Sequence, residues 1–386
     1  MKNYWTVGNS SVGFQVAVRN LQSLKYSSQL EPRMFGETKI KKFSLLLIAA
    51  ALLSIPILVL LGTRSRAESK EFLRLIQTIS IPNVKGRLDH LDVDVKGQRL
   101  FVSALENGTV EAVSLGTGKW VRSVPGFKKP QGISYVPSLN KLFIASGDDG
   151  MLRAFRGNTF ELIDSIKLEL GPNRVAYDPH AEILYVGYGG KDAGKEYGEV
   201  GVIDAKRDTK IRDIQVAAHP AELLLDRSGQ MLFVLVPVAN EIEVADTKAG
   251  RIVSTWPVTS QRPGDAALDD LNHRLFIGTH TPPEMIAMDS RTGKEVAALP
   301  TVDGMDGVYF DARRQRVYVS GGRGFEVGSV CVYQRHEGDH YSPIAKLATR
   351  AGAGTSFWSP DLDRYFVAAP AHDNEDTAIL VYQPQP

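Results

Sequence analysis

The sequence lacks the residues on which several common kinds of function depend. Cysteine occurs once, at Cys331, so no internal disulfide can form and no cysteine–histidine set has the spacing of a zinc site. A Cys-x-x-Cys-His haem motif and a Gly-x-Ser-x-Gly nucleophile motif are also absent. Cys331 itself lies in an apolar stretch, Val-Cys-Val-Tyr, where a small buried residue is expected. These absences argue against electron transfer by haem and against nucleophilic catalysis.

An excess of charge of one sign is missing as well. The 386 residues include 45 Lys and Arg against 44 Asp and Glu, which gives a formal net charge of +1. Such a balance produces no long-range field that would gather nucleic acid or anionic lipid. We therefore expect no nucleic-acid partner.

The N-terminal part differs in kind from the rest of the chain. Lys39, Lys41 and Lys42 precede an apolar run over residues 43–61, and Ser-Arg-Ala at 65–67 then offers a cleavage site before Glu68. This pattern predicts a signal peptide over 34–67, although the run is nearly long enough for an uncleaved membrane anchor. By hypothesis translation begins at Met34, which makes 1–33 an upstream extension. The folded domain is then expected at 68–386, in the periplasm or outside the cell.

One strand pattern recurs seven times along the rest of the chain. It consists of a leading residue, in most copies basic or polar, followed by apolar, aromatic and apolar residues, as in Arg-Leu-Phe-Val at 99–102. The second residues of the seven copies are 100, 142, 184, 232, 275, 317 and 365, in steps of 42, 42, 48, 43, 42 and 48. Within each unit, period-2 alternation is broken by Gly or Asn turns, as in a meander of four strands. A four-stranded sheet repeated at this period predicts a β-propeller blade.

The two ends of the repeat region predict that the ring closes on itself. The seventh unit, over 354–382, lacks a fourth strand, whereas the strand-like segment 72–81 precedes the first unit and has no blade of its own. Pairing the two would remove an exposed sheet edge. We expect an all-β fold, a seven-bladed β-propeller of four-stranded antiparallel blades, closed by the N-terminal strand in the last blade.

Three features carry a resemblance to a known family. They are the segment Gly-Arg-Leu-Asp-His-Leu-Asp-Val-Asp at 86–94, the repeated Leu-Phe-Val strands, and Ser-Pro-Asp-Leu-Asp-Arg-Tyr-Phe-Val-Ala at 359–368. Together they resemble the YncE-like, YVTN-repeat propellers of bacteria over all seven blades. The resemblance implies an exported binding or scaffold protein and no common reaction. The chain departs from the family motif, because it has Leu-Phe-Val or Val-Tyr-Val where Tyr-Val-Thr-Asn is expected. The resemblance therefore implies the fold but does not identify the partner.

A binding surface is predicted on one face of the ring, which we call the upper face. It carries the residues that lead into each inner strand and the turns between second and third strands. Aligned on the repeat, the units differ most at the start of the inner strand, a position that is mostly polar: His90, Gly132, Arg174, Glu222, Asp265, Gly307 and Thr355. Positions that serve structure tend to match among repeats, so this column favours recognition. The opposing interpretation is a polar, water-filled channel whose charges pair with one another. The predicted ligand-binding residues are Arg87, Asp89, His90, Asn173, Arg174, His219, Glu222, Arg262, Asp265 and Asp306.

A longer loop falls on the same face. The third unit is extended over residues 187–199, a Gly-rich segment with several charged residues, and the sixth and seventh units have distinctive loops from 321 and 372. Insertions gathered on one face of a repeat protein usually mark its binding face, although loops also drift freely.

Two enzymatic alternatives are kept open. A metal-dependent, lactonase-like hydrolase would need Glu222, Asp265, Asp89, Asn173 and His90 to converge as ligands around a metal. A quinoprotein-like oxidoreductase is suggested faintly by Thr-Gly-Lys turns, but only Trp120, Trp256 and Trp358 lie in the propeller, too few for a docking motif in every blade. We predict neither catalytic residues, nor metal ligands, nor a cofactor.

The favoured hypothesis is a monomeric binding or scaffold propeller that recognises a protein, peptide or small ligand on the upper face. Contact with a membrane is expected only through the N-terminal segment. Replacing Arg174 and Glu222 with Ala is expected to abolish binding and to leave the stability nearly unchanged.

Overall fold

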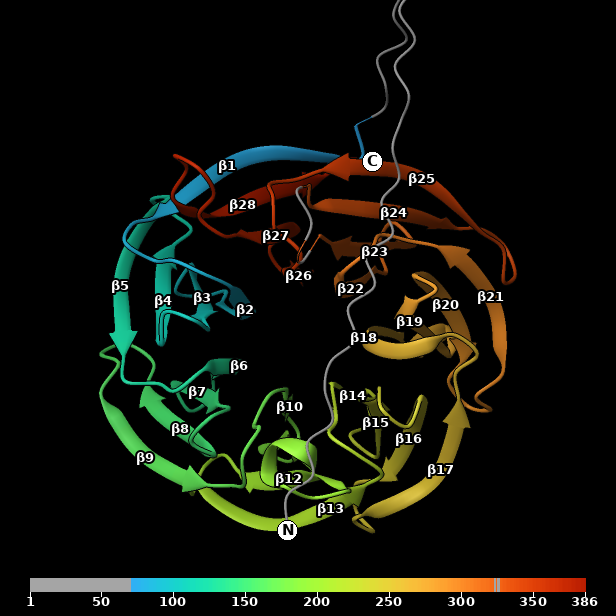
Figure 1. Cartoon of the computed structure of the whole chain (residues 1–386), viewed down its shortest axis with the longest axis horizontal. Helices are drawn as coiled ribbons and strands as arrows, with labels where there is room; N and C mark the ends of the chain where they lie inside the picture. Colours follow the sequence, from blue (N-terminus) through green and yellow to red (C-terminus); the bar gives the residue numbers. More distant parts are fainter. Residues whose placement is uncertain (1–70, 323, 325–326) are drawn as a thin grey trace, which may run out of the picture. The chain divides into compact units, whose positions relative to one another are not determined.

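The computed structural model describes residues 71–386, except 323, 325 and 326. Over these residues, seven sheets of four antiparallel strands stand around one central axis (Figure 1). The all-β class and the seven-bladed β-propeller are confirmed. The predicted extension 1–33 and the predicted signal or anchor 34–67 lie outside the described residues.

Each blade runs from an inner strand at the channel to an outer strand at the circumference. The inner strands are β2 (Leu88–Asp94), β6 (Pro130–Val136), β10 (Val175–Asp178), β14 (Glu222–Leu225), β18 (Gln261–Asp269), β22 (Met305–Asp311) and β26 (Ser356–Ser359). The second strands are β3 (Arg99–Ala104), β7 (Lys141–Ser146), β11 (Ile183–Gly189), β15 (Met231–Val236), β19 (Arg274–Thr281), β23 (Arg316–Gly321) and β27 (Arg364–Ala369).

The third strands are β4 (Thr109–Ser114), β8 (Met151–Arg156), β12 (Gly198–Asp204), β16 (Glu241–Asp246), β20 (Glu284–Asp289), β24 (Ser329–Arg335) and β28 (Thr377–Pro384). The outer strands are β5 (Lys119–Pro125), β9 (Leu162–Lys167), β13 (Thr209–Val216), β17 (Arg251–Pro257), β21 (Glu295–Pro300), β25 (Tyr341–Ala348) and, in blade 7, β1 (Leu73–Ile81). Blades 1 to 7 are named below in the order of their inner strands.

Strand β1 closes the ring. It pairs antiparallel with β28, from Leu73 opposite Pro384 to Ile81 opposite Thr377, and takes the outer place in the sheet of β26, β27 and β28. The first and last described strands thus lie side by side (Figure 1). This confirms the closure predicted from the unpaired segment before the first repeat.

The repeated Leu-Phe-Val pattern fills the spaces between blades. In β3, Leu100, Phe101 and Val102 are all fully buried, because a neighbouring blade covers each face of the sheet. Leu100 and Val102 pack toward blade 7, whereas Phe101 packs toward blade 2. Seven such clusters occupy the seven gaps between blades. A strand that is apolar at every position is therefore stable here, because both of its faces are buried. In a strand with one face in water, apolar and polar residues would alternate instead.

The lower face is held by aspartates at the ends of inner strands. Asp94 Oδ1 accepts a hydrogen bond from the Gly97 amide at 2.8 Å, which closes an Asx turn. Its Oδ2 also pairs with Arg99, whose guanidinium donates to the Gly157 carbonyl of the next blade. Asp94 thus closes a turn within its own blade and, through Arg99, links that blade to the next.

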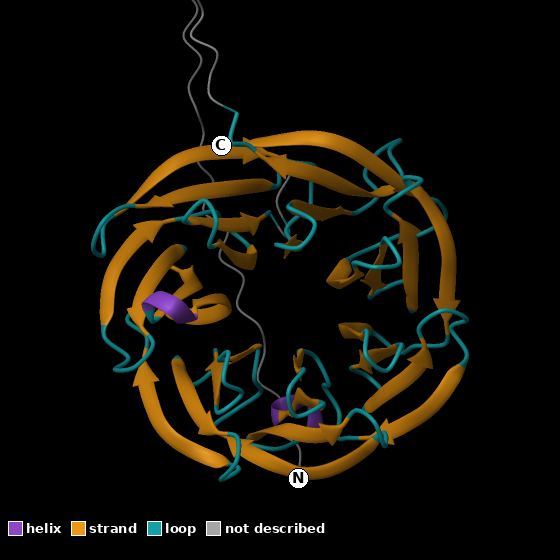
Figure 2. Cartoon of the chain, turned by 180° about the vertical axis from the view of Figure 1, so that it is seen from behind, coloured by secondary structure: helices purple, strands orange, loops and turns teal. Residues whose placement is uncertain are grey.

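Two short 3-10 helices mark the two faces. Helix η1 (Gly190–Ala193) lies in the extended loop of blade 3 and is nearer the viewer in Figure 1, whereas η2 (Asp270–Asn272) is nearer the viewer in Figure 2. In the part of the chain that the structure describes, no helix is both long and apolar enough to cross a bilayer.

Candidate functional site

A cavity of about 350 Å³ opens on the upper face at the mouth of the channel. It is lined from six of the inner strands or the residues that lead into them, by the turn that follows β15, and by His280 near the end of β19. Three of its four acidic side chains are the most buried of its charged groups, since those of Glu222, Asp89 and Asp265 are 2%, 4% and 9% exposed. The basic side chains lie nearer the solvent, with Arg87 at 23% and Lys129 at 38%. The cavity therefore has an acidic floor and a basic rim.

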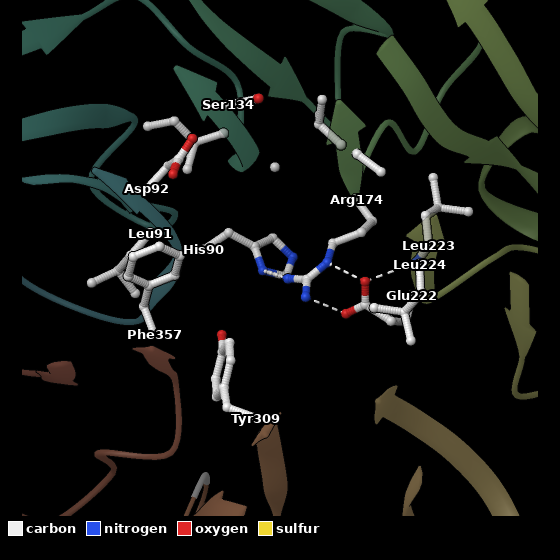
Figure 3. Close-up of a pocket in the computed structure, with 14 residues that line it drawn as sticks. His90, Leu91, Asp92, Ser134, Arg174, Glu222, Leu223, Leu224, Tyr309 and Phe357 are labelled. Atoms are coloured by element: carbon white, nitrogen blue, oxygen red, sulfur yellow. Dashed lines mark hydrogen bonds and ion pairs between the residues drawn. The ribbon is translucent and has the colours of Figure 1, made fainter. Parts of the chain in front are cut away.

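Arg174 spans the channel beneath this cavity. From blade 3 it reaches Glu222 of blade 4, to which Nε donates at 2.6 Å while Nη2 pairs with the second carboxylate oxygen. Its Nη1 donates at 2.6 Å to Nδ1 of His90 in blade 1 (Figure 3). Burial alone would lower the pKa of Arg174, but Glu222 and Asp265 outweigh it and raise that pKa. The guanidinium is thus a fixed positive charge across the pore.

His90 is neutral and has one defined tautomer. Burial and the neighbouring Arg174 lower its pKa from 6.5 to about 3. Because Nδ1 accepts from Arg174, Nε2 carries the proton and faces the side-chain oxygen of Asn173 at 3.1 Å. Both ring nitrogens are engaged, so His90 orients Arg174 and Asn173 and offers no free base.

Glu222 and Asp265 form a carboxyl pair that holds a proton. Burial raises the pKa of Glu222, against the pull of Arg174, and burial together with Glu222 raises the pKa of Asp265 well above its usual value. Arg174 Nη2 lies 3.9 Å from Asp265 Oδ1, beyond hydrogen-bond distance, so Arg174 lowers the pKa of Asp265 through charge alone and does not offset the effect of burial. We assign the proton to Asp265, which then donates to Glu222.

A second polar group lies beside the first. Arg87 Nη2 is 3.4 Å from Asp89 and 3.6 Å from Asp306. Asp306 also accepts a hydrogen bond at 2.8 Å from the hydroxyl of Thr355, which faces the Leu88 carbonyl as well. This group ties blades 1, 6 and 7 together at the rim.

A smaller cavity of about 210 Å³ lies on the other side of Arg174 (Figure 3). It is lined largely by apolar groups, among them Leu224 and Phe357, and by the carboxylate of Asp92. Burial raises the pKa of Asp92 to about 6, although amide hydrogen bonds from Tyr135 and Val93 act in the other direction. The Tyr309 hydroxyl points into this space in the close-up and donates to the Ser356 carbonyl at 2.6 Å.

The structure brings together most of the residues predicted from the repeat alignment. Those that line the upper cavity are Arg87, Asp89, His90, Asn173, Glu222, Arg262, Asp265 and Asp306. Arg174 lies directly below, in contact with His90 and Glu222. His219 lies apart: its Nδ1 faces the Gly189 carbonyl at 3.1 Å, and its backbone packs closely against Gly190. The extended loop of blade 3 therefore provides His219 with a structural contact.

Three members of the divergent column have structural reasons for their identity. A Cβ on Gly132 would lie 1.8 Å from the Asn173 carbonyl oxygen, so only glycine fits there. A Cβ on Gly307 would lie 2.5 Å from the Ser356 hydroxyl. Thr355 bonds neighbouring blades. Divergence in this column thus reflects packing between unequal neighbours as well as the lining of the cavity.

Several lining residues were missed from the sequence. They are Lys129, Gln131, Ala221, Pro237, Gly264, His280 and Met305 in the upper cavity, and Asp92 and Tyr309 below it. Gln131 and Asp92 lie one residue before and two after the chosen column, so a wider window along the inner strand would have found them. Pro237 and His280 come from second-to-third-strand turns, which the alignment placed on the upper face without naming residues.

The residues proposed for a metal are committed to other contacts. Arg174 lies between His90 and Glu222, and Asn173 Oδ1 faces the His90 ring. Across residues 71–386, the three masked positions aside, no three His, Cys, Asp or Glu side chains are grouped as metal ligands. A guanidinium thus supplies the positive charge between two of the candidate ligands.

Comparison with known proteins supports the fold and does not identify the family. The chain matches no family model and no curated protein. A solved structure described as Kuenenia stuttgartiensis hydrazine synthase is similar at TM-score 0.67 and 19% identity, over 78% of this chain and 97% of that one. A chain of a mitotic checkpoint complex is similar at TM-score 0.68 and 12% identity, over 81% of this chain and 92% of that one. At such identities the likeness shows the propeller fold alone, so membership of the YVTN-repeat family stays a prediction.

Proposed function

We propose that the protein is an exported binding propeller that takes a small ligand, or the end of a peptide, into the upper cavity. Export rests on the predicted signal segment, and binding rests on the cavity. The observation that carries the proposal is convergence: polar side chains from blades 1 to 6 meet at one hollow of about 350 Å³. Pockets of this size are typical of small-molecule sites.

The burial of the charges supports a binding role over a merely solvated channel. Ion pairs at a solvated surface contribute little and cost little desolvation. Here Glu222 and Asp89 are almost completely buried, which is costly unless the arrangement has a use or full compensation. Such preorganised polar groups at a cavity wall are what fixes the orientation of a ligand.

A thermal-shift screen against soluble metabolites and short peptides tests the proposal. Compounds that stabilise the wild-type protein should lose their effect in Gln131→Trp, which places an indole in the cavity. Leu162→Trp is the control, because Leu162 is 56% exposed on an outer strand. Compounds that stabilise all three proteins equally would place binding elsewhere, and a screen without any stabilising compound would count against a small-ligand role.

A further inference from the structure

The floor of the upper cavity carries more negative than positive groups. Three carboxyl groups, those of Asp89, Glu222 and Asp265, face one guanidinium group, that of Arg174. Arg174 is held by Glu222, and Arg87 is shared between Asp89 and Asp306. Asp265 has no arginine within 3.5 Å, which distinguishes it from Glu222.

Asp265 is also a buried acid with one carboxyl oxygen that lacks a hydrogen-bond donor. The residue is 7% exposed, and its Oδ1 accepts no hydrogen bond from an N–H or O–H donor among the described residues. A buried carboxyl oxygen in this position loses its water without a replacement, which is unfavourable. A cationic donor that reached Asp265 from the cavity, with a rotation of the carboxyl group, would give this oxygen a partner.

We infer that the cavity selects ligands with a primary ammonium group, which binds against Asp265 with its carbon chain directed outward. This inference rests on the proposed binding function and names its ligand class. An ammonium group has three N–H donors and no acceptor, so it suits a floor of carboxylates. A ligand carboxylate at that depth would instead meet Glu222 and Asp265 at close range.

The rim indicates what the other end of the ligand carries. Arg262 lines the cavity, is exposed, and forms no ion pair within the described part of the chain. Lys129 is 3.5 Å from Asp148, but both are solvent-exposed, so that pair is weak. A carboxylate directed outward would meet these two cations. The favoured ligands are thus zwitterions, either free amino acids or the N-terminal end of a peptide.

Binding should release a proton. Glu222, Arg174, Asp306, Tyr309 and Tyr365 lie around Asp265, and in the free protein burial and Glu222 raise the pKa of its carboxyl well above the usual value. An ammonium group supplies the missing positive charge, so the Asp265 proton leaves to solvent as the ion pair forms.

Titration calorimetry with five probes tests the inference: 6-aminohexanoate, hexylamine, hexanoate, triglycine and N-acetyltriglycine. We expect at least one of the three ammonium compounds to bind, with release of up to one proton measured from buffers of different ionisation enthalpy. Hexanoate and N-acetyltriglycine should not bind. Binding of 6-aminohexanoate without triglycine indicates free amino acids, and the reverse indicates a peptide end.

Two variants separate the floor from the rim. Asp265→Asn should weaken ammonium binding at least about tenfold and abolish the proton release, because the contact is a charged, buried one. Arg262→Ala should weaken a zwitterion about two- to fivefold and leave hexylamine unchanged, as expected for an exposed charge. Urea unfolding of each variant checks that the fold is retained.

The outcomes that overturn the inference are distinct from those that overturn the binding function. Binding of hexanoate in place of hexylamine, or equal affinity in Asp265→Asn, shows that the ammonium site is wrong while a cavity ligand remains. The same holds if none of the five probes binds but screen compounds still lose their effect in Gln131→Trp. Failure of both experiments removes the binding function itself.

Discussion

Replacement of Arg174 by Met should destabilise the protein strongly, in contrast to the expectation from sequence that this residue lies on a dispensable binding surface. The Arg174 side chain is 17% exposed and its partner Glu222 is 2% exposed. Methionine keeps much of the volume but removes every donor. Glu222 then keeps its carboxylate without a counter-charge, and Nδ1 of His90 loses the donor at 2.6 Å.

The expected loss is about 3–5 kcal/mol of unfolding free energy, the range found when one partner of a buried ion pair is removed. Protonation of Glu222 relieves part of the cost, so we expect the lower half of that range at pH 7. Equilibrium unfolding in urea measures it, with Arg207→Met as the control. Arg207 pairs with Asp204 but is 76% exposed, so its loss should cost less than about 1 kcal/mol.

A double variant separates the charge from the packing. Arg174→Met with Glu222→Met removes both charges, and replacing a buried pair by apolar groups is often nearly neutral. It should therefore be more stable than Arg174→Met alone. Additive losses, or a loss below about 1 kcal/mol in the single variant, would refute the buried bridge across the channel.

Three further predictions concern the same region. Asp265→Asn should change the unfolding free energy by less than about 1 kcal/mol at pH 7 in urea, since asparagine resembles the protonated acid; a larger loss would mean that the carboxyl is ionised in the free protein. Between pH 7.5 and 8.5 the stability of the wild type should fall as pH rises, by up to about 1.4 kcal/mol per unit, and this slope should be lost in Asp265→Asn. The sign follows because a raised folded pKa means that the folded state keeps a proton which the unfolded chain loses near pH 4. His90 contributes a slope of the opposite sign near its unfolded pKa of 6.5, so the window begins one unit above that value. Gly132→Ala should cost about 1–3 kcal/mol in thermal or urea unfolding, because its Cβ would lie 1.8 Å from the Asn173 carbonyl oxygen; an unaffected protein would mean that the neighbouring strand yields freely.

The fold could be predicted from the sequence because a propeller repeats the same strand pattern, with the same packing between blades, seven times. Leu100 and Phe101 are adjacent in one strand and pack toward different blades, and this requirement recurs in every repeat. The unpaired strand before the first repeat predicted the closure by β1 for a similar local reason, since a sheet edge needs a partner.

The location of the site residues could be predicted from the sequence, but their hydrogen-bond and ion-pair partners could not. Repeat alignment placed His90, Glu222 and Asp265 at equivalent heights in the channel, and they do line one cavity. Gly132 lets the Asn173 carbonyl of blade 3 approach blade 2 closely, and the adjacent Arg174 reaches beyond blade 2 to His90 of blade 1. Contacts between blades that far apart in sequence leave no periodic trace. His219 was predicted to bind ligand but does not line the cavity, because its ring is oriented by a contact with the Gly189 carbonyl in a neighbouring loop.

A crystal structure of the protein with the tightest-binding ammonium probe tests the central claim most directly. The account predicts the ligand nitrogen in the upper cavity, within about 3.2 Å of a carboxylate oxygen of Asp265, with the chain leading toward Arg262. A ligand bound on the lower face or along the outer strands, or one that directs its carboxylate to the floor, would contradict it.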